Sequence, residues 1–132
     1  MASFSNYLES KVLNYLFNGA AFSIGTLYVG LYTAAPTDAG GGTEVSGNGY
    51  ARVAVTCNTT NFPTTNDGTI ENGVTFDFPT PTGNWGTVTH IGLFDAATAG
   101  NLLAWAPLVT IRTITTGATV RINQNQLTIG LE

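Results

Sequence analysis

The side chains that could carry out chemistry are few and far apart in this sequence. His90 is the only histidine and Cys57 the only cysteine. A Ser–His–Asp triad could use His90, but no nucleophile-elbow motif is present, and a metal site needs several ligands at characteristic spacing. We therefore expect His90 to be a strand histidine bonded to a neighbour. We expect Cys57 to be a small buried strand residue without a disulfide partner, and we expect no metal and no cofactor.

The acidic residues do not form an obvious catalytic pair. Glycoside hydrolysis needs two carboxylates about 5 to 10 Å apart across a cleft. Most of the acids fall in predicted loops or at strand edges, where they are typical turn-forming or solvated residues: Asp38, Glu44, Asp67, Glu71, Asp77 and Asp95. The sequence therefore predicts no catalytic residue, and a protein that is not an enzyme.

Two further features could contact a partner. Residues 40–49 read GGGTEVSGNG and include Gly41 and Gly42, but they lack the GK[ST] ending and following helix of a phosphate-binding loop. We interpret them as a flexible excursion between two strands, long enough to suggest a contact role for these glycines. Trp85, in GNWG, either packs over one end of the fold or contacts a partner. Trp105, in LLAW, is predicted to lie in the core.

Composition excludes some classes of partner. Only 9% of the residues are charged, against about 25% in typical soluble domains, and the net charge is −4. Four basic residues cannot supply the many phosphate contacts of a nucleic-acid-binding protein. The apolar stretches are far shorter than the roughly 20 residues of a membrane span, and no signal peptide is recognised. We expect no nucleic-acid or membrane partner, and synthesis in the cytoplasm.

One helix is predicted near the N-terminus, within residues 1–19. Ser3 or Ser5 can cap it, Asn6 and Glu9 resemble a capping box, and Gly19 is a suitable end.

Its apolar residues recur at helical spacing and make a wide stripe. Either this face packs on the protein's own sheet, or part of it docks on a neighbouring subunit. Tyr7, Leu13 and Phe17 are the interface candidates of the second alternative.

The rest of the chain, residues 26–132, has the alternation and turn residues of short strands. The predicted strands are 27–33, 50–57, 74–78, 88–94, 102–109 with a continuation at 111–114, and a closing hairpin of 118–122 with 126–131. No strand–helix–strand alternation supports a parallel sheet. The sequence predicts one domain over residues 1–132, mainly β, an antiparallel β-sandwich or jelly roll with one N-terminal α-helix.

Four motifs carry a resemblance to known proteins. They are LYVGLYTAAPTD (27–38), SGNGYARVAV (46–55), GNWGTVTHIGLFDA (83–96) and GNLLAW (100–105). With the N-terminal helix, the pattern resembles a family of small tailed-phage proteins often labelled phage tail fiber protein, over nearly the whole chain. The resemblance implies a virion component, made in the host cytoplasm, with no catalytic residues to transfer.

Within the virion, two roles are open. Fibres are long and repetitive, whereas this sequence has no repeat and no heptads. We therefore expect a capsid decoration (cement) protein that binds the phage major capsid protein and stabilises the shell, as a homo-oligomeric dimer or trimer. The alternative is a tail or tail-fibre-associated protein that binds tail proteins or a host-surface glycan, through Trp85 or Tyr50.

Overall fold

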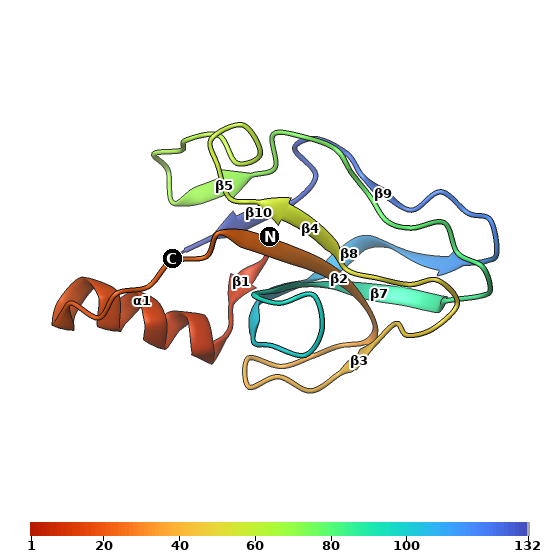
Figure 1. Ribbon diagram of the computed structural model, residues 1–132, viewed down its shortest axis with the longest axis horizontal. Helices are drawn as coiled ribbons and strands as arrows, with labels where there is room; N and C mark the ends of the chain where they lie inside the picture. The colour runs from red at the N-terminus through yellow and green to blue at the C-terminus, as the bar shows by residue number, and fades with distance from the viewer. Residues whose placement is uncertain (132) are drawn as a thin grey trace.

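A six-stranded antiparallel sheet forms the main layer of the protein, with strands in the order β1-β8-β7-β2-β3 and β4 also paired to β2 (Figure 1). The computed structural model describes residues 1–131. The strands of this sheet are β1 (Ser3–Phe4), β2 (Thr26–Ala34), β3 (Thr43–Glu44), β4 (Val53–Thr56), β7 (Gly86–Phe94) and β8 (Leu102–Ile114). β3 and β4 share the edge of β2 that faces away from β7.

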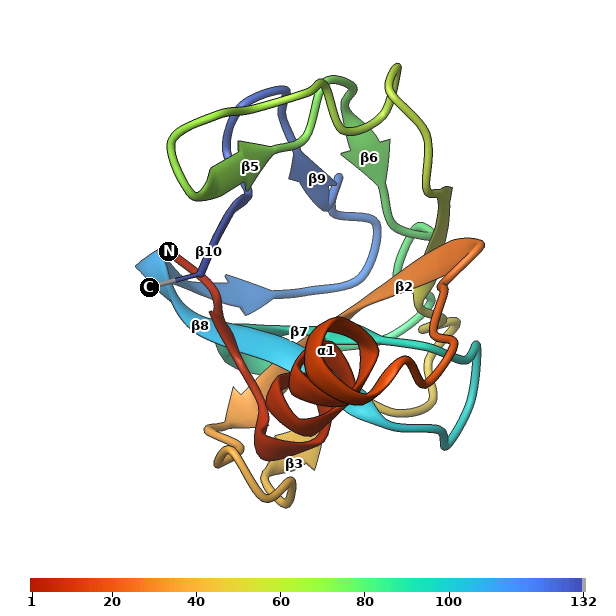
Figure 2. The ribbon, with the colours of Figure 1, turned by 90° about the vertical axis from the view of Figure 1, so that its left-hand side faces the viewer.

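A second layer consists of two short antiparallel ladders. β5 (Thr69–Glu71) pairs with β10 (Thr128–Gly130), and β6 (Phe76–Asp77) pairs with β9 (Arg121–Ile122). Figure 2 shows these four strands above the main sheet. The prediction of a mainly β, antiparallel sandwich is confirmed. The described strands do not form the two four-stranded sheets of a jelly roll.

The core lies between the two layers, and strand alternation explains which residues enter it. Leu27, Val29 and Leu31 of β2 point inward because successive side chains of a strand face opposite sides. Inward residues of β7 and β8 continue this surface, and the second layer adds Phe76 and Leu127. The outward residues of β2 and β7 belong to a separate polar and aromatic face on the other side of the main sheet.

The helix α1 (Asn6–Asn18) begins and ends where the sequence predicts. Ser5 is the N-cap, and its hydroxyl accepts a hydrogen bond from the Leu8 amide. Gly19 closes the helix at φ 73°, a conformation that glycine adopts without strain. No residue of α1 is buried, although Tyr7 and Leu8 pack against the core. The packing of the helix on its own sheet is therefore limited to its first turns.

The predicted closing hairpin is wrong. β9 pairs with β6 and β10 pairs with β5, so the two strands never pair with each other. The turn that joins them is bonded to Asn72, a fully buried side chain whose Oδ1 accepts from the Leu127 amide at 2.9 Å. Its Nδ2 donates to the carbonyls of Asn123 and Val74, at 2.9 and 2.8 Å. Asn72 thus holds the turn between β9 and β10 from inside the second layer.

Other local predictions need correction. Cys57 is exposed rather than buried, because β4 ends at Thr56 and the predicted strand 50–57 is shorter than its alternation suggests. Trp105 is half-buried on the outward face, where its indole N–H donates to Asp38. The excursion 40–49 contains β3 and the buried Val45, so it is tied to the edge of β2.

Candidate functional site

The outward face of the main sheet is packed with side chains around two glycines of its central strands. A Cβ atom on Gly30 would lie 2.8 Å from Glu44 Oε2 and 2.9 Å from the Tyr50 hydroxyl. A Cβ atom on Gly92 would lie 2.6 Å from the ring of Tyr32. These glycines therefore provide the space in which long side chains cross the sheet.

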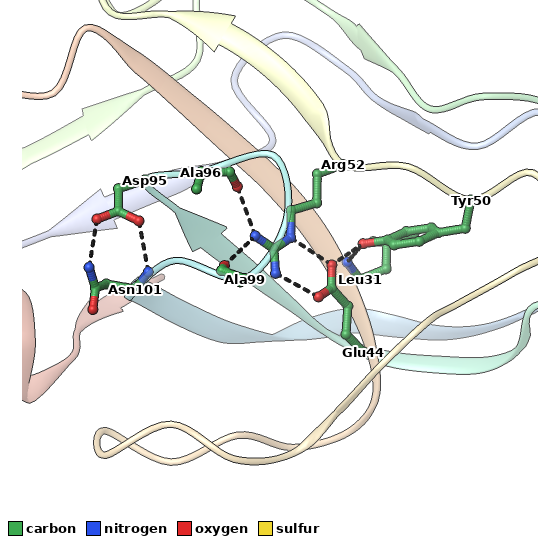
Figure 3. Close-up of polar contacts among 8 residues, drawn as sticks. All are labelled: Leu31, Glu44, Tyr50, Arg52, Asp95, Ala96, Ala99 and Asn101. Carbon is green, nitrogen blue, oxygen red and sulfur yellow. Dashed lines mark hydrogen bonds and ion pairs between the residues drawn. The ribbon is translucent and has the colours of Figure 1, made fainter.

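Arg52 and Glu44 form the centre of this face (Figure 3). Arg52 Nε donates to Glu44 Oε2 and its terminal nitrogen donates to Oε1, each at 2.8 Å. This two-point geometry fits a guanidinium to a carboxylate. Arg52 lies immediately before β4 and Glu44 ends β3, so the pair ties together the two segments that share one edge of β2. Burial lowers the pKa of Arg52, but the hydrogen bond and charge of Glu44 outweigh it and leave the pKa raised.

The remaining nitrogen of Arg52 fixes the loop between β7 and β8. It donates to the carbonyls of Ala96 and Ala99 at 2.8 and 2.9 Å. Within the same loop, Asp95 accepts from the backbone and side-chain amides of Asn101, at 2.7 and 2.9 Å (Figure 3). The guanidinium also lies 3.5 Å from the centre of the Phe94 ring, a cation–π contact. One side chain thus joins three separate segments.

Tyr50 completes the cluster and links it to Trp85. The Tyr50 hydroxyl donates to Glu44 Oε2 at 2.6 Å and accepts from the Leu31 amide at 3.0 Å. Burial, followed by the hydrogen bond to Glu44, raises the pKa of Tyr50 well above its usual range. Its ring meets Trp85 edge-on, with centres 5.2 Å apart. We call Glu44, Tyr50 and Arg52 the arginine cluster.

The arginine cluster is suited to holding loops in place. Glu44 accepts bonds from both Arg52 and Tyr50, so its oxygens are already engaged. His90 shares a 2.8 Å hydrogen bond with the hydroxyl of its neighbour Thr89, as predicted. Within residues 1–131, no group of three or more His, Cys, Asp or Glu side chains is placed to hold a metal ion.

The structure separates the interface candidates named from sequence. Leu13 and Phe17 lie together on the projecting second half of α1, and Phe17 is 80% exposed. Tyr7 is half-buried at the other end of the helix. Gly41 is exposed with open space around it, whereas a Cβ atom on Gly42 would meet the backbone of Ala34 and Pro36 at under 3.0 Å.

Trp85 is packed inside. It is 5% exposed, and its indole N–H donates to the Asn48 carbonyl at 2.9 Å. Of the two alternatives for Trp85, packing over one end of the fold is therefore the one this structure has. Trp85 takes no part in an exposed surface of this chain.

Sequence reasoning missed the arginine cluster. It placed Leu16 in the apolar stripe of the helix but did not name it as an interface candidate. Leu16 lies three residues after Leu13 and beside Phe17, so the three apolar side chains share one exposed helix face. The signal for the arginine cluster was present in the segment TEVSGNGYAR (43–52), where a lone acid stands eight residues before a lone arginine. Only the pairing of β3 and β4 with the same edge of β2 reveals their contact.

Comparison with known protein families gives one match. The sequence profile of a family described as podophage GP4 fiber I protein gp80 matches residues 3–130. The chain belongs to this family. The fiber I family is one of phage structural proteins, so the prediction of a tailed-phage virion component is confirmed at that level. No curated protein matches the chain.

The match spans both the helix and the polar face of the sheet. It includes the whole of α1 and every residue of the arginine cluster. Among the described residues, no helix has the length and apolar character needed to cross a membrane.

Proposed function

We propose that this fiber I family member is a structural subunit of the fibre apparatus on a podophage tail, and that it acts by packing against other virion proteins. The single observation that carries the proposal is the exposed apolar face of α1 in a chain of this family. Contiguous exposed apolar side chains on a soluble protein mark interaction surfaces.

The chemistry of this face suits burial in a protein–protein contact. Leu13, Leu16 and Phe17 are large and exposed, and residues 12–18 carry no charge. A partner can therefore cover these side chains without burying an unpaired charge, which would cost free energy. Phe17 is the natural anchor, because hot spots in interfaces are large, well-packed side chains.

The arginine cluster supports this role by fixing the loops around the main sheet. Arg52, just before β4, is joined to Glu44 of β3 and to the loop 95–101 by four hydrogen bonds, and it also contacts the Phe94 ring. Preformed loops lose little conformational entropy when a partner covers them. A subunit that must fit many copies of a lattice or fibre benefits from such rigidity.

Adhesion to a host-surface glycan through Trp85 or Tyr50 has less support. Trp85 is buried, and the Tyr50 hydroxyl is engaged by Glu44 and Leu31. The Trp85 ring is therefore not presented for stacking on a sugar, and the half-buried Tyr50 ring packs edge-on against it.

A capsid decoration protein is the second candidate, and one observation favours it. Residues 1–131 fold into two packed layers with no shaft of repeated or coiled-coil structure, which an elongated fibre would need. In that role the partner is the major capsid protein, and many weak contacts on equivalent sites add up.

Copy number and position in purified virions test the proposal. We expect a few to a few tens of copies per particle, measured by quantitative mass spectrometry against the major capsid protein, and antibody labelling at the tail. Hundreds of copies spread over the shell would overturn the fibre assignment and establish decoration instead.

A complementation experiment tests the role of the helix. Particles grown with Phe17→Ser are expected to contain several-fold less of this protein than particles with Ser10→Ala, a change at an exposed position of the same helix. Equal incorporation of the two variants would show that the apolar face of α1 is not used.

A further inference from the structure

A cavity of about 500 Å³ opens between the two layers of the sandwich. Buried apolar side chains form its floor, among them Leu31, Val88 and Ile91 of the main sheet and Phe78 and Leu127 of the second layer. Its volume lies in the range of about 300 to 1,000 Å³ that binding pockets occupy. It is too large to be an ordinary packing defect in a protein interior.

The mouth of the cavity runs along the free edge of β8. β1 covers this edge only opposite Ala104 and Trp105. Further along, Val88 pairs with Arg112 while His90 pairs with Pro107, so residues 108–111 of β8 stand opposite Thr89 alone and bulge out of the sheet. Val109, in this bulge, is fully exposed and lines the cavity. The rim of the cavity is therefore apolar at this bulge.

The charges at the mouth are positive. Arg112 lines the cavity and forms no ion pair or side-chain hydrogen bond with any residue of 1–131. Arg121 also lines the cavity and is paired with Asp77 at 2.6 Å, in an exposed salt bridge. A guanidinium that no side chain of residues 1–131 engages, at an apolar opening, favours a partner that brings negative charge with an apolar surface.

The second half of α1 has that combination. Leu13, Leu16 and Phe17 project from it, and the last turn has no basic residue. A helix C-terminus carries a partial negative charge of about half an elementary charge. This apolar end is therefore complementary to the mouth of the cavity in both polarity and charge.

The helix cannot fill the cavity of its own chain. No residue of α1 lines that cavity. The start of α1 is tied to other segments, because the Ser5 and Asn6 amides donate to Leu103 and Asp38 at 2.7 and 3.0 Å. Its other end leads within eight residues into β2 of the main sheet. The cavity of one copy is thus open to the helix of another.

We propose that the projecting half of α1, with Leu13, Leu16 and Phe17, inserts into the β8-side cavity of a second copy of this chain. The two surfaces lie on different parts of each subunit, so the contact is heterologous, and repeated copies build a ring or a filament. This inference names the partner of the same helix face and in that sense rests on the proposed function. It concerns contacts between purified subunits, whereas position and copy number in virions test the function itself.

A mixing experiment with two surface variants tests this arrangement. One variant, Leu16→Ser with Phe17→Ser, removes the helix surface, and the other, Val109→Ser with Arg112→Glu, alters the mouth. Because all four positions are exposed, both variants are expected to fold, as thermal unfolding will check. Sedimentation of the wild-type protein should show concentration-dependent self-association, which each variant weakens about a hundredfold. Ser10→Ala is the control and should associate as the wild type does.

The decisive sample is the equimolar mixture. Each variant keeps one intact surface, so the mixture should form a one-to-one dimer and no larger species, although neither variant associates alone. If the mouth variant still self-associates while the helix variant does not, the contact is helix against helix and the proposal is overturned. A wild-type protein that stays monomeric at millimolar concentration would overturn it as well.

Discussion

Arg52 and Glu44 meet in a two-point ion pair across the outward face of the main sheet, with side chains only 7% and 24% exposed. Arg121 and Asp77 form a second pair on β9 and β6, with side chains 50% and 56% exposed. One arginine–carboxylate pair is therefore largely shielded from solvent and makes further contacts, whereas the other is exposed to water. The loss of the first pair should accordingly cost more stability than the loss of the second.

Arg52→Met is expected to destabilise the protein by about 2 to 4 kcal/mol, because Glu44 and two loop carbonyls lose their donor in a mostly buried place. Arg121→Met should cost much less, because water screens an exposed ion pair. Urea unfolding measures both values. Equal losses for the two variants would mean that the arginine cluster contributes no more than a surface pair.

Gly30→Ala is expected to cost about 1 to 3 kcal/mol, because the new Cβ atom would press on Glu44, Tyr50 and Phe94 at 2.8 to 2.9 Å. Gly25→Ala, just before β2, is the matched control, since nothing lies within 4 Å of its Cβ position. That variant should unfold within about 0.5 kcal/mol of the wild type or be slightly more stable. A harmless Gly30→Ala would show that the side chains over this face move aside freely.

Alkaline pH is expected to weaken the fold through Tyr50. The pKa of this phenol is raised in the folded protein, so its contribution is complete below the unfolded value of about 10 and is lost as the pH rises above it. The slope from this group reaches at most about 1.4 kcal/mol per pH unit. Burial also raises the pKa of Tyr32, which adds in the same direction.

Tyr50→Phe tests this assignment. The variant should be about 1 to 2 kcal/mol less stable than the wild type at pH 8, because the bonds to Glu44 and Leu31 are lost. The gap should narrow between about pH 10 and 11.5, as measured by unfolding at each pH. Tyr15→Phe, on the exposed part of α1, is the control. If the unfolding free energies of the wild type and Tyr50→Phe changed with pH in parallel, the assignment would be contradicted.

Asn72→Ala is expected to cost about 2 to 4 kcal/mol, because the Leu127 amide and the Asn123 and Val74 carbonyls lose a buried partner. In the variant, the Leu127 amide should exchange its hydrogen faster than the amides of β7 do. Asn84→Ala, at an exposed position, should leave both stability and exchange unchanged. A local loss of protection without a global loss of stability would place Asn72 outside the cooperative core.

The parts of the fold that sequence predicted well are those with local causes. Ser5 and Gly19 bound α1 because capping depends on residues within one turn, and alternation located β2 and β7 almost to the residue. Pairing partners are not local. The hairpin of 118–131 was expected because its strands are adjacent in sequence. They pair instead with β5 and β6, some fifty residues away, in the segment where Asn72 bonds to the turn between them.

The candidate surfaces also divide into features set by local sequence and features set by the tertiary fold. The apolar stripe of α1 was visible in its spacing, and Leu13 and Phe17 were named from it. Exposure was not visible, because Trp85 and Leu16 have similar apolar character and opposite burial. The cavity could not be foreseen at all, since it arises where β8 bulges away from β7 between two layers.

Ala2, just before β1, is tied to the last described strand, β10. The Ala2 amide donates to the Thr128 carbonyl at 2.7 Å, and the Gly130 amide donates to the Ala2 carbonyl at 3.0 Å. Synthesis proceeds at about 5 to 20 residues per second. Ala2 is therefore made long before Thr128 and Gly130, its hydrogen-bond partners. The ladder of β5 and β10 can form only after residues 128–130 have left the ribosome. Until then the side of the cavity formed by residues 126–128 is missing, so an unfinished chain has no formed pocket for the helix of another copy.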